Sequence, residues 1–167
     1  MDDLVIEAPG HPDNFHHYLG IFHGLWLATD IIIDYAIGRF LKSPHEDTHI
    51  LTAGLEFGRK IRILIDLAKR STDPKKEILV EALRTMQGSK REIITHSYLK
   101  SDKDKIIFLN RSRGGPYKAT ETKFSREEFI DHVKTLVLAA QKFETHLDLN
   151  EDDFQKFAAS ALSLNQN

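Results

Sequence analysis

The sequence predicts an all-α protein: a four-helix up-and-down bundle with a small β-hairpin inserted before the last long helix and a short C-terminal tail helix. Apolar residues recur at steps of three, four and seven over four long segments, which is the pattern of amphipathic helices. The pattern changes once, where β-branched and aromatic residues stand on both sides of a glycine and proline cluster.

The composition predicts one soluble domain. The chain has 167 residues, of which 41% are hydrophobic and 29% are charged. We expect a single domain over residues 1–167, with a core at about 14–148 and a tail at 149–167. Cysteine is absent, which excludes disulfides, thiolate nucleophiles and cysteine zinc sites.

The first two predicted helices are each marked by an apolar stripe. The first helix runs from about Asn14 to Lys42, and Ser43–Pro44 ends it because proline cannot continue a helix. Its stripe consists of Tyr18, Phe22, Leu25, Ile32, Ala36 and Phe40. The second stripe runs from Ile50 to Ala68, and the short link between the two predicts antiparallel packing.

Two pairs of glycines on these helices, Gly20 with Gly24 and Gly54 with Gly58, are spaced four residues apart. A glycine inside a helix is less favourable than alanine by about 1 kcal/mol. We expect a neighbouring helix to approach closely at these positions and to compensate for that loss.

The third predicted helix opens at the cluster Ser71–Pro74, which supplies N-cap candidates and a proline for the first turn. Arg91 and His96 then lie in its last turns. Its apolar stripe consists of Ile78, Leu79, Leu83, Met86, Ile93 and Ile94.

The next segment, residues 105–124, predicts a two-stranded hairpin around a turn at Arg113–Pro116. It belongs to the most basic part of the chain. From Lys90 to Lys123 there are nine lysines and arginines and four acidic residues, although the whole chain has a net charge of −2. Such a segment would attract a phosphate-bearing ligand. The alternative is that its lysines only protect the edges of the sheet from pairing.

Two capping signals define the remaining helices. Ser125 and Glu128 form a capping box, which predicts a long helix over about 126–148. Asn150 caps a short amphipathic tail helix that extends to about Leu162.

The N-terminal part of the chain predicts a cytoplasmic protein without a membrane segment. The first residues are acidic and lack the basic region and apolar core of a signal peptide. The most apolar window is interrupted by His23, Asp30 and Asp34 before it reaches the roughly 20 apolar residues of a membrane span. We therefore expect the first helix to lie in the core.

An arginine and a histidine, Arg91 and His96, stand five residues apart in the stretch KREIITHS. The pairs Arg39–His45 and Arg126–His132 have a similar spacing, so spacing alone does not identify a functional pair. Context favours Arg91 and His96, which close a predicted core helix and lead into the basic segment. Five residues of helix turn by about 140° and rise by roughly 7.5 Å, so both side chains can flank one cleft. Glu92, four residues before His96, faces it.

This arrangement resembles the HEPN superfamily (higher eukaryotes and prokaryotes nucleotide-binding). The resemblance covers about residues 14–148: a four-helix unit whose third helix ends in Arg91-Glu92-Ile93-Ile94-Thr95-His96, then an elaborated segment and a final long helix. It implies metal-independent RNA cleavage at a homodimer interface, where motifs from both subunits face one cleft. Many members act as toxins or in defence against phage. The position of Glu92 is usually Asn, Asp or His in that family.

The resemblance also implies roles for single residues. His96 would exchange protons with the ribose 2′-hydroxyl and the leaving 5′-oxygen, Arg91 would stabilise the transition state, and Glu92 would orient the imidazole. Neither a cofactor nor a metal is expected. The expected partners are a second copy of the chain, RNA or a nucleotide, and an antitoxin or nucleotidyltransferase protein. The expected substrate-binding residues are Lys90, Ser97, Lys100, Arg111 and Arg113.

Two other interpretations remain open for the Arg91–His96 motif. A non-catalytic helical bundle would bind a nucleotide, RNA or a partner protein through the same cleft. In a purely structural protein, Arg91 would pair with a carboxylate such as Glu56, and His96 would only lie near a helix C-terminus, where a cation is favourable.

A polar stripe on the first helix is a weak candidate for a metal site. His16, His23, Asp30 and Asp34 fall nearly on one helix face. A carboxylate-bridged bundle site needs Glu-x-x-His on two helices, and the sequence contains no such motif. We expect the stripe to face solvent or a dimer cleft, and we expect no metal.

Overall fold

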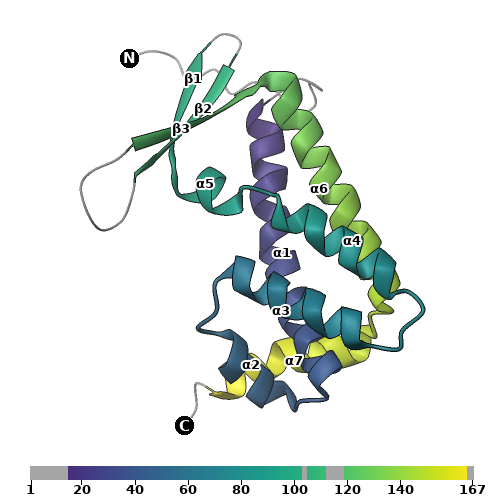
Figure 1. The fold of residues 1–167 in the computed structure, drawn as a ribbon. Coiled ribbons are helices and arrows are strands. Elements are labelled where there is room, and N and C mark those ends of the chain that lie inside the picture. Colours follow the sequence, from purple (N-terminus) through teal and green to yellow (C-terminus); the bar gives the residue numbers. More distant parts are fainter. Residues whose placement is uncertain (1–14, 103–104, 112–118, 165–167) are drawn as a thin grey trace. The chain divides into compact units, whose positions relative to one another are not determined.

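The protein is mainly helical, with a small three-stranded antiparallel sheet, in the computed structural model (Figure 1). The structure describes residues 15–102, 105–111 and 119–164. The elements are, in chain order, α1 (Phe15–Leu41), α2 (His45–Thr52), α3 (Phe57–Arg70), α4 (Lys76–Gln87), α5 (Arg91–His96), β1 (Tyr98–Asp102), β2 (Lys105–Arg111), β3 (Ala119–Ser125), α6 (Arg126–Leu147) and α7 (Glu151–Ser163). The prediction of a mainly α-helical protein is confirmed.

Contacts within the chain divide it into two compact units. The sheet unit comprises Met1–His23 and Lys90–Lys134, and the helical unit comprises Gly24–Ser89 and Thr135–Asn167. The first turns of α1 and of α6 belong to the sheet unit, and the rest of both helices belongs to the helical unit. Each unit buries its own set of apolar side chains.

The first helix, α1, has nearly the predicted bounds. Within the described ranges it is the one helix that is long and apolar enough to cross a membrane, judged by length and composition alone. Core helices of soluble proteins meet the same test, and Phe22, Ile33 and Ala36 have no exposed surface. These residues support the predicted role of α1 as a core helix.

The second predicted helix is two helices in the structure, so that prediction is wrong. Helix α2 ends at Thr52, and α3 begins at Phe57. Glu56, the N-cap of α3, has an extended backbone with ψ of 147°, which cannot continue a helix. The apolar stripe runs through the break because it includes Ile50. In the structure Ile50 is 65% exposed, and the buried residues of α2 are threonines, which an apolar pattern does not include.

The third predicted helix is also two helices. Helix α4 ends at Gln87, and the N–H of Gly88 donates to carbonyl oxygens in the last turn of α4. Lys90 then takes a left-handed conformation with φ of 54°, and α5 begins anew at Arg91. The expectation that Arg91 and His96 lie in the last turns of a core helix is therefore wrong. They open and close a separate six-residue helix.

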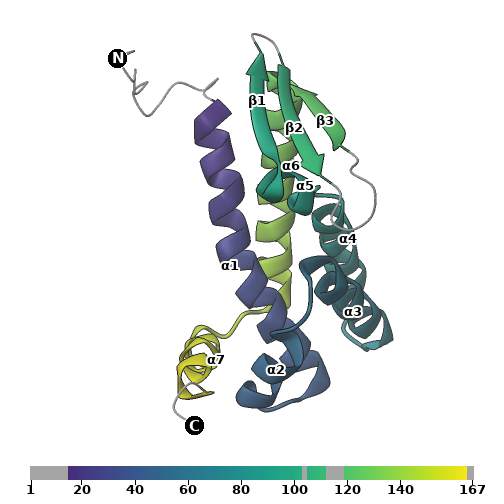
Figure 2. The same cartoon turned by 90° about the vertical axis from the view of Figure 1, so that its left-hand side faces the viewer.

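The segment after α5 forms three antiparallel strands in the order β1-β2-β3, where the sequence predicts a two-stranded hairpin (Figure 2). Lys105 of β2 pairs with Ser125 of β3, and Tyr98 of β1 pairs with Leu109 of β2. The additional strand is β1. The predicted turn at Arg113–Pro116 lies outside the described residues.

One face of the sheet builds the core of the sheet unit. Ile106, Phe108 and Phe124 are at most 7% exposed. The ring centroid of Phe129, in the first turn of α6, lies 5.9 Å from that of Phe108 and 5.7 Å from that of Phe124. Phe15, the first residue of α1, packs edge-on against Phe129 at 5.1 Å. Packed aromatic rings of this kind contribute burial and a preferred edge-to-face geometry, so they hold the three elements together.

The last long helix and the tail helix agree with their predictions. The backbone N–H of Ser125 donates to Glu128 Oε2 at 2.7 Å, and the N–H of Glu128 donates to Ser125 Oγ at 3.0 Å, which is the predicted capping box. Asn150 Oδ1 accepts an N–H three residues later at 3.0 Å. Phe157 of α7 is 1% exposed and stacks on His49 of α2 at 4.0 Å, which docks the tail helix.

The helical unit contains a buried ion cluster. Lys60 Nζ of α3 donates to Asp30 Oδ1 at 3.2 Å and to Asp34 Oδ2 at 2.8 Å. Burial raises the pKa of the Asp34 carboxyl, and the Lys60 ammonium opposes that rise. The expectation that the polar stripe of α1 faces solvent or a dimer cleft is therefore wrong for Asp34, whose side chain is 15% exposed, whereas that of Asp30 is 32% exposed. The other two members, His16 and His23, are exposed.

The prediction of close helix approach at the two glycine pairs is wrong. In the described structure, a Cβ atom added at any of them would meet nothing within 4 Å. The close approach occurs at Gly38 of α1, where an added Cβ would lie 2.5 Å from Thr48 Oγ1 of α2. No sequence spacing singles out this glycine.

Candidate functional site

The predicted motif lies on α5, which is anchored by its own first turn. The backbone N–H groups of Ile93 and Ile94 donate to the carbonyl of Lys90 at 3.0 and 2.9 Å. The Ile94 side chain is 3% exposed, and α5 packs against β2. One buried isoleucine thus fixes which face of this short helix is turned outward.

The three motif residues, Arg91, Glu92 and His96, all lie on this helix, and Glu92 and His96 are near each other. The His96 side chain is 55% exposed and that of Glu92 is 69% exposed. Glu92 Oε2 lies 3.7 Å from His96 Nε2, and Arg91 is half-buried. Since Arg91 and His96 are the first and last residues of α5, their offset is still about 140° and roughly 7.5 Å along the axis. The histidine is accessible to a ligand.

Two neighbours of the motif, Lys90 and Ser97, have different surroundings. Lys90 is exposed, and its Nζ lies 4.8 Å from the ring centroid of Phe124, which is a cation–π contact. Ser97 Oγ is buried, and no hydrogen-bond partner for it is found among the described residues. The ammonium of Lys90 stabilises the sheet unit, and the Ser97 hydroxyl does not face solvent.

The other expected substrate-binding residues belong to the sheet or its turn. Lys100 is exposed on β1, Arg111 ends β2, and Arg113 lies outside the described residues. Two lysines outside the expected site, Lys105 and Lys123, are also exposed on this sheet. Alternation of buried and exposed residues along β2 and β3 is the signal that could have found them.

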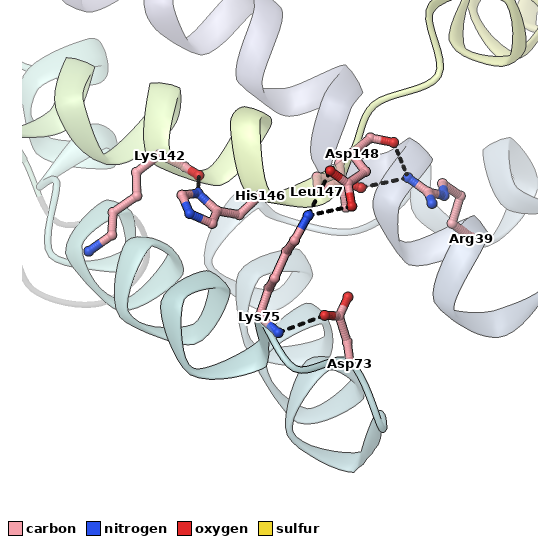
Figure 3. A network of polar contacts seen from close by, with 7 residues as sticks. All are labelled: Arg39, Asp73, Lys75, Lys142, His146, Leu147 and Asp148. Carbon is pink, nitrogen blue, oxygen red and sulfur yellow. Dashed lines mark hydrogen bonds and ion pairs between the residues drawn. The ribbon is translucent and has the colours of Figure 1, made fainter.

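A second Arg–His pair, Arg39 and His45, makes structural contacts. Arg39 Nη1 donates to the carbonyl of Leu147 at 2.8 Å and to that of Asp148 at 3.2 Å, at the end of α6 (Figure 3). His45 Nε2 lies 3.5 Å from Asp153 Oδ1 at the start of α7. Both side chains thus connect helices within the helical unit.

The third pair, Arg126 and His132, stands on α6. Arg126 is exposed as the first residue of the helix. His132 is half-buried, and its ring lies 5.6 Å from that of Phe124. Of the three pairs, Arg91 and His96 are the two residues that lie on one short helix and include a largely exposed histidine.

A polar network lies at the end of α6 (Figure 3). It borders a cavity of about 170 Å³. Lys75 Nζ donates to both carboxylate oxygens of Asp148, at 2.8 and 2.6 Å. The backbone N–H of Lys75 donates to Asp73 Oδ1 at 2.7 Å. The cavity is lined by Arg39, Phe40, Asp73 and Leu147. Arg39 and Lys75, the cations beside this cavity, already bind the C-terminal end of α6. We therefore assign this network a role in the stability of the fold.

The candidate site is therefore the outward face of α5 together with the exposed side of the sheet. Within the described ranges, no three histidine, aspartate or glutamate side chains are grouped so that they could hold a metal ion. In comparisons with known proteins, no family model, no curated protein and no solved structure matches this chain.

Proposed function

We propose that this protein is a metal-independent endoribonuclease of the HEPN type that acts as a homodimer, in a toxin or defence role. The observation that carries the proposal is the exposed His96 side chain on α5, beside Glu92 and next in the chain to a lysine-bearing sheet. A group that transfers protons must reach its substrate, and His96 meets that requirement.

The proposed reaction is attack of a ribose 2′-oxygen on the adjacent phosphorus. A neutral His96 takes the proton of the 2′-hydroxyl, and a protonated His96 gives a proton to the leaving 5′-oxygen. The products are a 2′,3′-cyclic phosphate and a 5′-hydroxyl. One histidine takes up a proton and the other releases one, so the protons balance. A homodimer would supply both histidines, one as base and one as acid.

Arg91 is suited to stabilising the transition state. Its guanidinium is charged at every physiological pH and carries its donors in a planar fork that matches phosphate oxygens. Arg91 stands at the opposite end of α5 from His96, so a substrate phosphate between them would meet both groups. Glu92 would orient the imidazole from one helical turn away.

The arrangement of the long helices is part of the same proposal. We propose a four-helix up-and-down arrangement built from α1, α3, α4 and α6. Two observations support it: α3 packs against α4, and all four helices bury apolar side chains. A cytoplasmic location and an antitoxin or nucleotidyltransferase partner are the further expectations of this function.

The test is cleavage of a labelled single-stranded RNA by the purified chain in the presence of EDTA. We expect cleavage to persist with the chelator and to leave a 2′,3′-cyclic phosphate. His96→Ala should lower the rate by about 10²–10⁴-fold, as the loss of a general acid–base does. Arg91→Ala should also abolish most of the activity. Cleavage that EDTA abolishes would show that the metal-free mechanism is wrong.

Matched control variants separate chemistry from stability. His23→Ala removes an exposed histidine of α1, and Arg126→Ala removes the exposed arginine that begins α6. Both should cleave like the wild type. If His96→Ala and Arg91→Ala cleave normally but melt several degrees lower, these two residues are structural.

The second candidate function is a non-catalytic RNA- or nucleotide-binding protein. The exposed carboxylate of Glu92, at a position that is usually Asn, Asp or His in the family, favours it because a negative charge repels phosphate. RNA binding by the wild type without cleavage would support this function and contradict the nuclease.

The homodimer is tested by sedimentation. We expect a dimer at micromolar concentration in analytical ultracentrifugation. A monomer under those conditions would contradict a composite site built from two subunits.

A further inference from the structure

The three-stranded sheet has one buried face and one exposed face. Ile106, Phe108 and Phe124 point into the core of the sheet unit. Successive side chains of a strand point to opposite faces, so their neighbours along β2 and β3 belong to the other face. The residues of that exposed face with described side chains are Tyr98, Lys100, Lys105, Ile107, Leu109, Ala119, Glu121, Lys123 and Ser125.

These residues are arranged in rows across the strands. Ile107 pairs with Lys100 on one side and with Lys123 on the other. Because neighbouring strands are about 4.8 Å apart, the two lysines start roughly 10 Å apart. The row beside it contains Tyr98, Leu109 and Glu121. Half-buried apolar side chains thus form the centre of the face, and lysines flank it.

Among the described side chains of this face, positive charge exceeds negative charge. Its described side chains include Lys100, Lys105 and Lys123 but one carboxylate, Glu121. Glu121 Oε2 lies 2.7 Å from Lys123 Nζ, and the ammonium groups of Lys123 and, more weakly, Lys100 lower the pKa of this carboxyl. The pairing leaves Lys100 and Lys105 as the cations of this face without a carboxylate in contact among the described contacts.

An aromatic side chain stands at the edge of the same face. Tyr98 is 63% exposed, although a tyrosine ring is large and mostly apolar. It begins β1 two residues after His96, so it follows the proposed catalytic helix directly. An exposed ring beside lysines is the combination with which proteins bind unpaired bases and their phosphates.

We propose that this sheet face binds single-stranded nucleic acid, with Tyr98 stacking on a base and Lys100, Lys105 and Lys123 contacting phosphates. The proposal rests on the proposed function for its expectation that the physiological strand is RNA, and it extends that function from the α5 site to the sheet. A duplex offers no unstacked base to a tyrosine, so single strands should be preferred.

Protection of the sheet edges does not account for this face. Lysines on edge strands do prevent pairing with other chains, and Lys100 and Lys123 are on edge strands. Lys105, however, is on the central strand, and neither an exposed tyrosine nor a central apolar strip has a part in edge protection.

The test is fluorescence anisotropy with three labelled probes of one sequence: single-stranded RNA, single-stranded DNA and duplex RNA. The DNA probe has no 2′-hydroxyl, so the proposed nuclease cannot cut it and binding is measured free of cleavage. We expect both single strands to bind with similar affinity and the duplex to bind more weakly. Tyr98→Ala should weaken single-strand binding roughly tenfold, whereas Tyr98→Phe should retain it.

The lysines are tested by the dependence of binding on salt. Lys100→Ala with Lys105→Ala should weaken binding to both single strands and reduce the slope of log affinity against log salt by about one to two. Lys156→Ala, at an exposed lysine of α7, is the matched control and should change neither. Circular dichroism verifies that each variant is folded.

The outcomes separate this inference from the proposed function. Binding to DNA that depends on Tyr98, together with uncut RNA, supports the sheet face and overturns the nuclease. RNA cleavage with normal DNA binding by Tyr98→Ala and by the lysine variant overturns the sheet face. Equal loss of binding in Lys156→Ala overturns it as well, because the effect would then be one of overall charge.

Discussion

The Oε2 atom of Glu92 lies 3.7 Å from the Nε2 atom of His96, one helical turn later on α5. Both side chains are more than half exposed, so water screens the pair and its contribution to folding stability is small. The carboxylate stands beside the imidazole that would contact the substrate in the proposed site, and its negative charge repels phosphate.

Glu92→Asn should strengthen binding of a single-stranded DNA probe by roughly threefold at low salt, because the variant removes an exposed negative charge beside the proposed phosphate site. The gain should shrink at high salt, where charges are screened. Anisotropy titrations at two salt concentrations measure both effects.

Glu127→Gln is the matched control, because Glu127 is an exposed carboxylate in the first turn of α6. It should leave the affinity unchanged. If the wild type binds RNA without cutting it, cleavage gained in Glu92→Asn would identify the chain as a binding descendant of a nuclease. Equal affinities of Glu92→Asn and the wild type would contradict a phosphate site on α5.

Two glycines of α1 predict stability changes of opposite sign. Gly24→Ala should stabilise the fold by about 1 kcal/mol, because alanine favours the helix and an added Cβ meets no described atom within 4 Å. Gly38→Ala should destabilise it by about 1–3 kcal/mol, because its Cβ would overlap the buried Thr48 side chain. Urea denaturation of the two variants measures both values.

Thr48 cannot simply turn away from an added methyl group. Its hydroxyl donates to the carbonyl of Pro44 at 2.9 Å, so another rotamer would lose that bond. Combining Gly38→Ala with Thr48→Ala should therefore recover part of the lost stability. A double variant that is as unstable as the sum of the two single variants would show that the two sites are not in contact.

The sequence predicts those elements whose ends carry their own local signals. The capping box of Ser125 with Glu128 and the cap at Asn150 depend on side chains within three residues of the backbone that they bind, and both predictions are correct. Pro44 likewise separates α1 from α2. These signals need no knowledge of distant contacts.

The errors occur where apolar spacing continues across a break in the helix. Met86 and Ile94 are both buried and eight residues apart, so the spacing suits one helix, yet Lys90 between them is left-handed. A left-handed lysine has no strong sequence signal, because this conformation is uncommon outside glycine and asparagine. Strand β1 was missed because its pairing with β2, rather than any propensity of Tyr98–Asp102, determines it.

Asp148 provides a prediction on pH dependence. Its contact with Lys75 holds the pKa of the Asp148 carboxyl below its usual value. A lowered pKa in the folded state stabilises the fold at pH values above the usual value of about 4, and this contribution is lost as the pH falls through the folded value. Lys75→Gln should thus lower the melting temperature slightly at neutral pH and not at about pH 2.

Lys76→Gln is the control for that measurement, since Lys76 is the next residue and no contact of its ammonium is among those described. It should have the same effect at both pH values. An NMR titration in which the Asp148 carboxyl titrates at its usual pKa would contradict the ion pair.

The loss of Lys60 should destabilise the protein strongly. Its side chain is 9% exposed and neutralises Asp30 and Asp34, of which Asp34 is 15% exposed. Removing one partner of a buried ion pair leaves an uncompensated charge and typically destabilises a protein by about 3–5 kcal/mol. We expect a loss of this size for Lys60→Met at neutral pH, whereas Lys69→Met, at an exposed lysine of the same helix, should change little.

The loss in Lys60→Met should also depend on pH in a defined direction. Burial already raises the pKa of Asp34, and Lys60 is the group that opposes the rise, so the pKa of Asp34 should be higher still in the variant. A raised carboxyl pKa in the folded state favours folding at low pH, and this advantage is lost as the pH rises through that value. The deficit of the variant should therefore be smaller at about pH 5 than at about pH 7. Urea denaturation at both pH values measures it. A deficit that is equal at both, or larger at the lower pH, would show that Asp34 does not remain charged and buried beside the substituted residue.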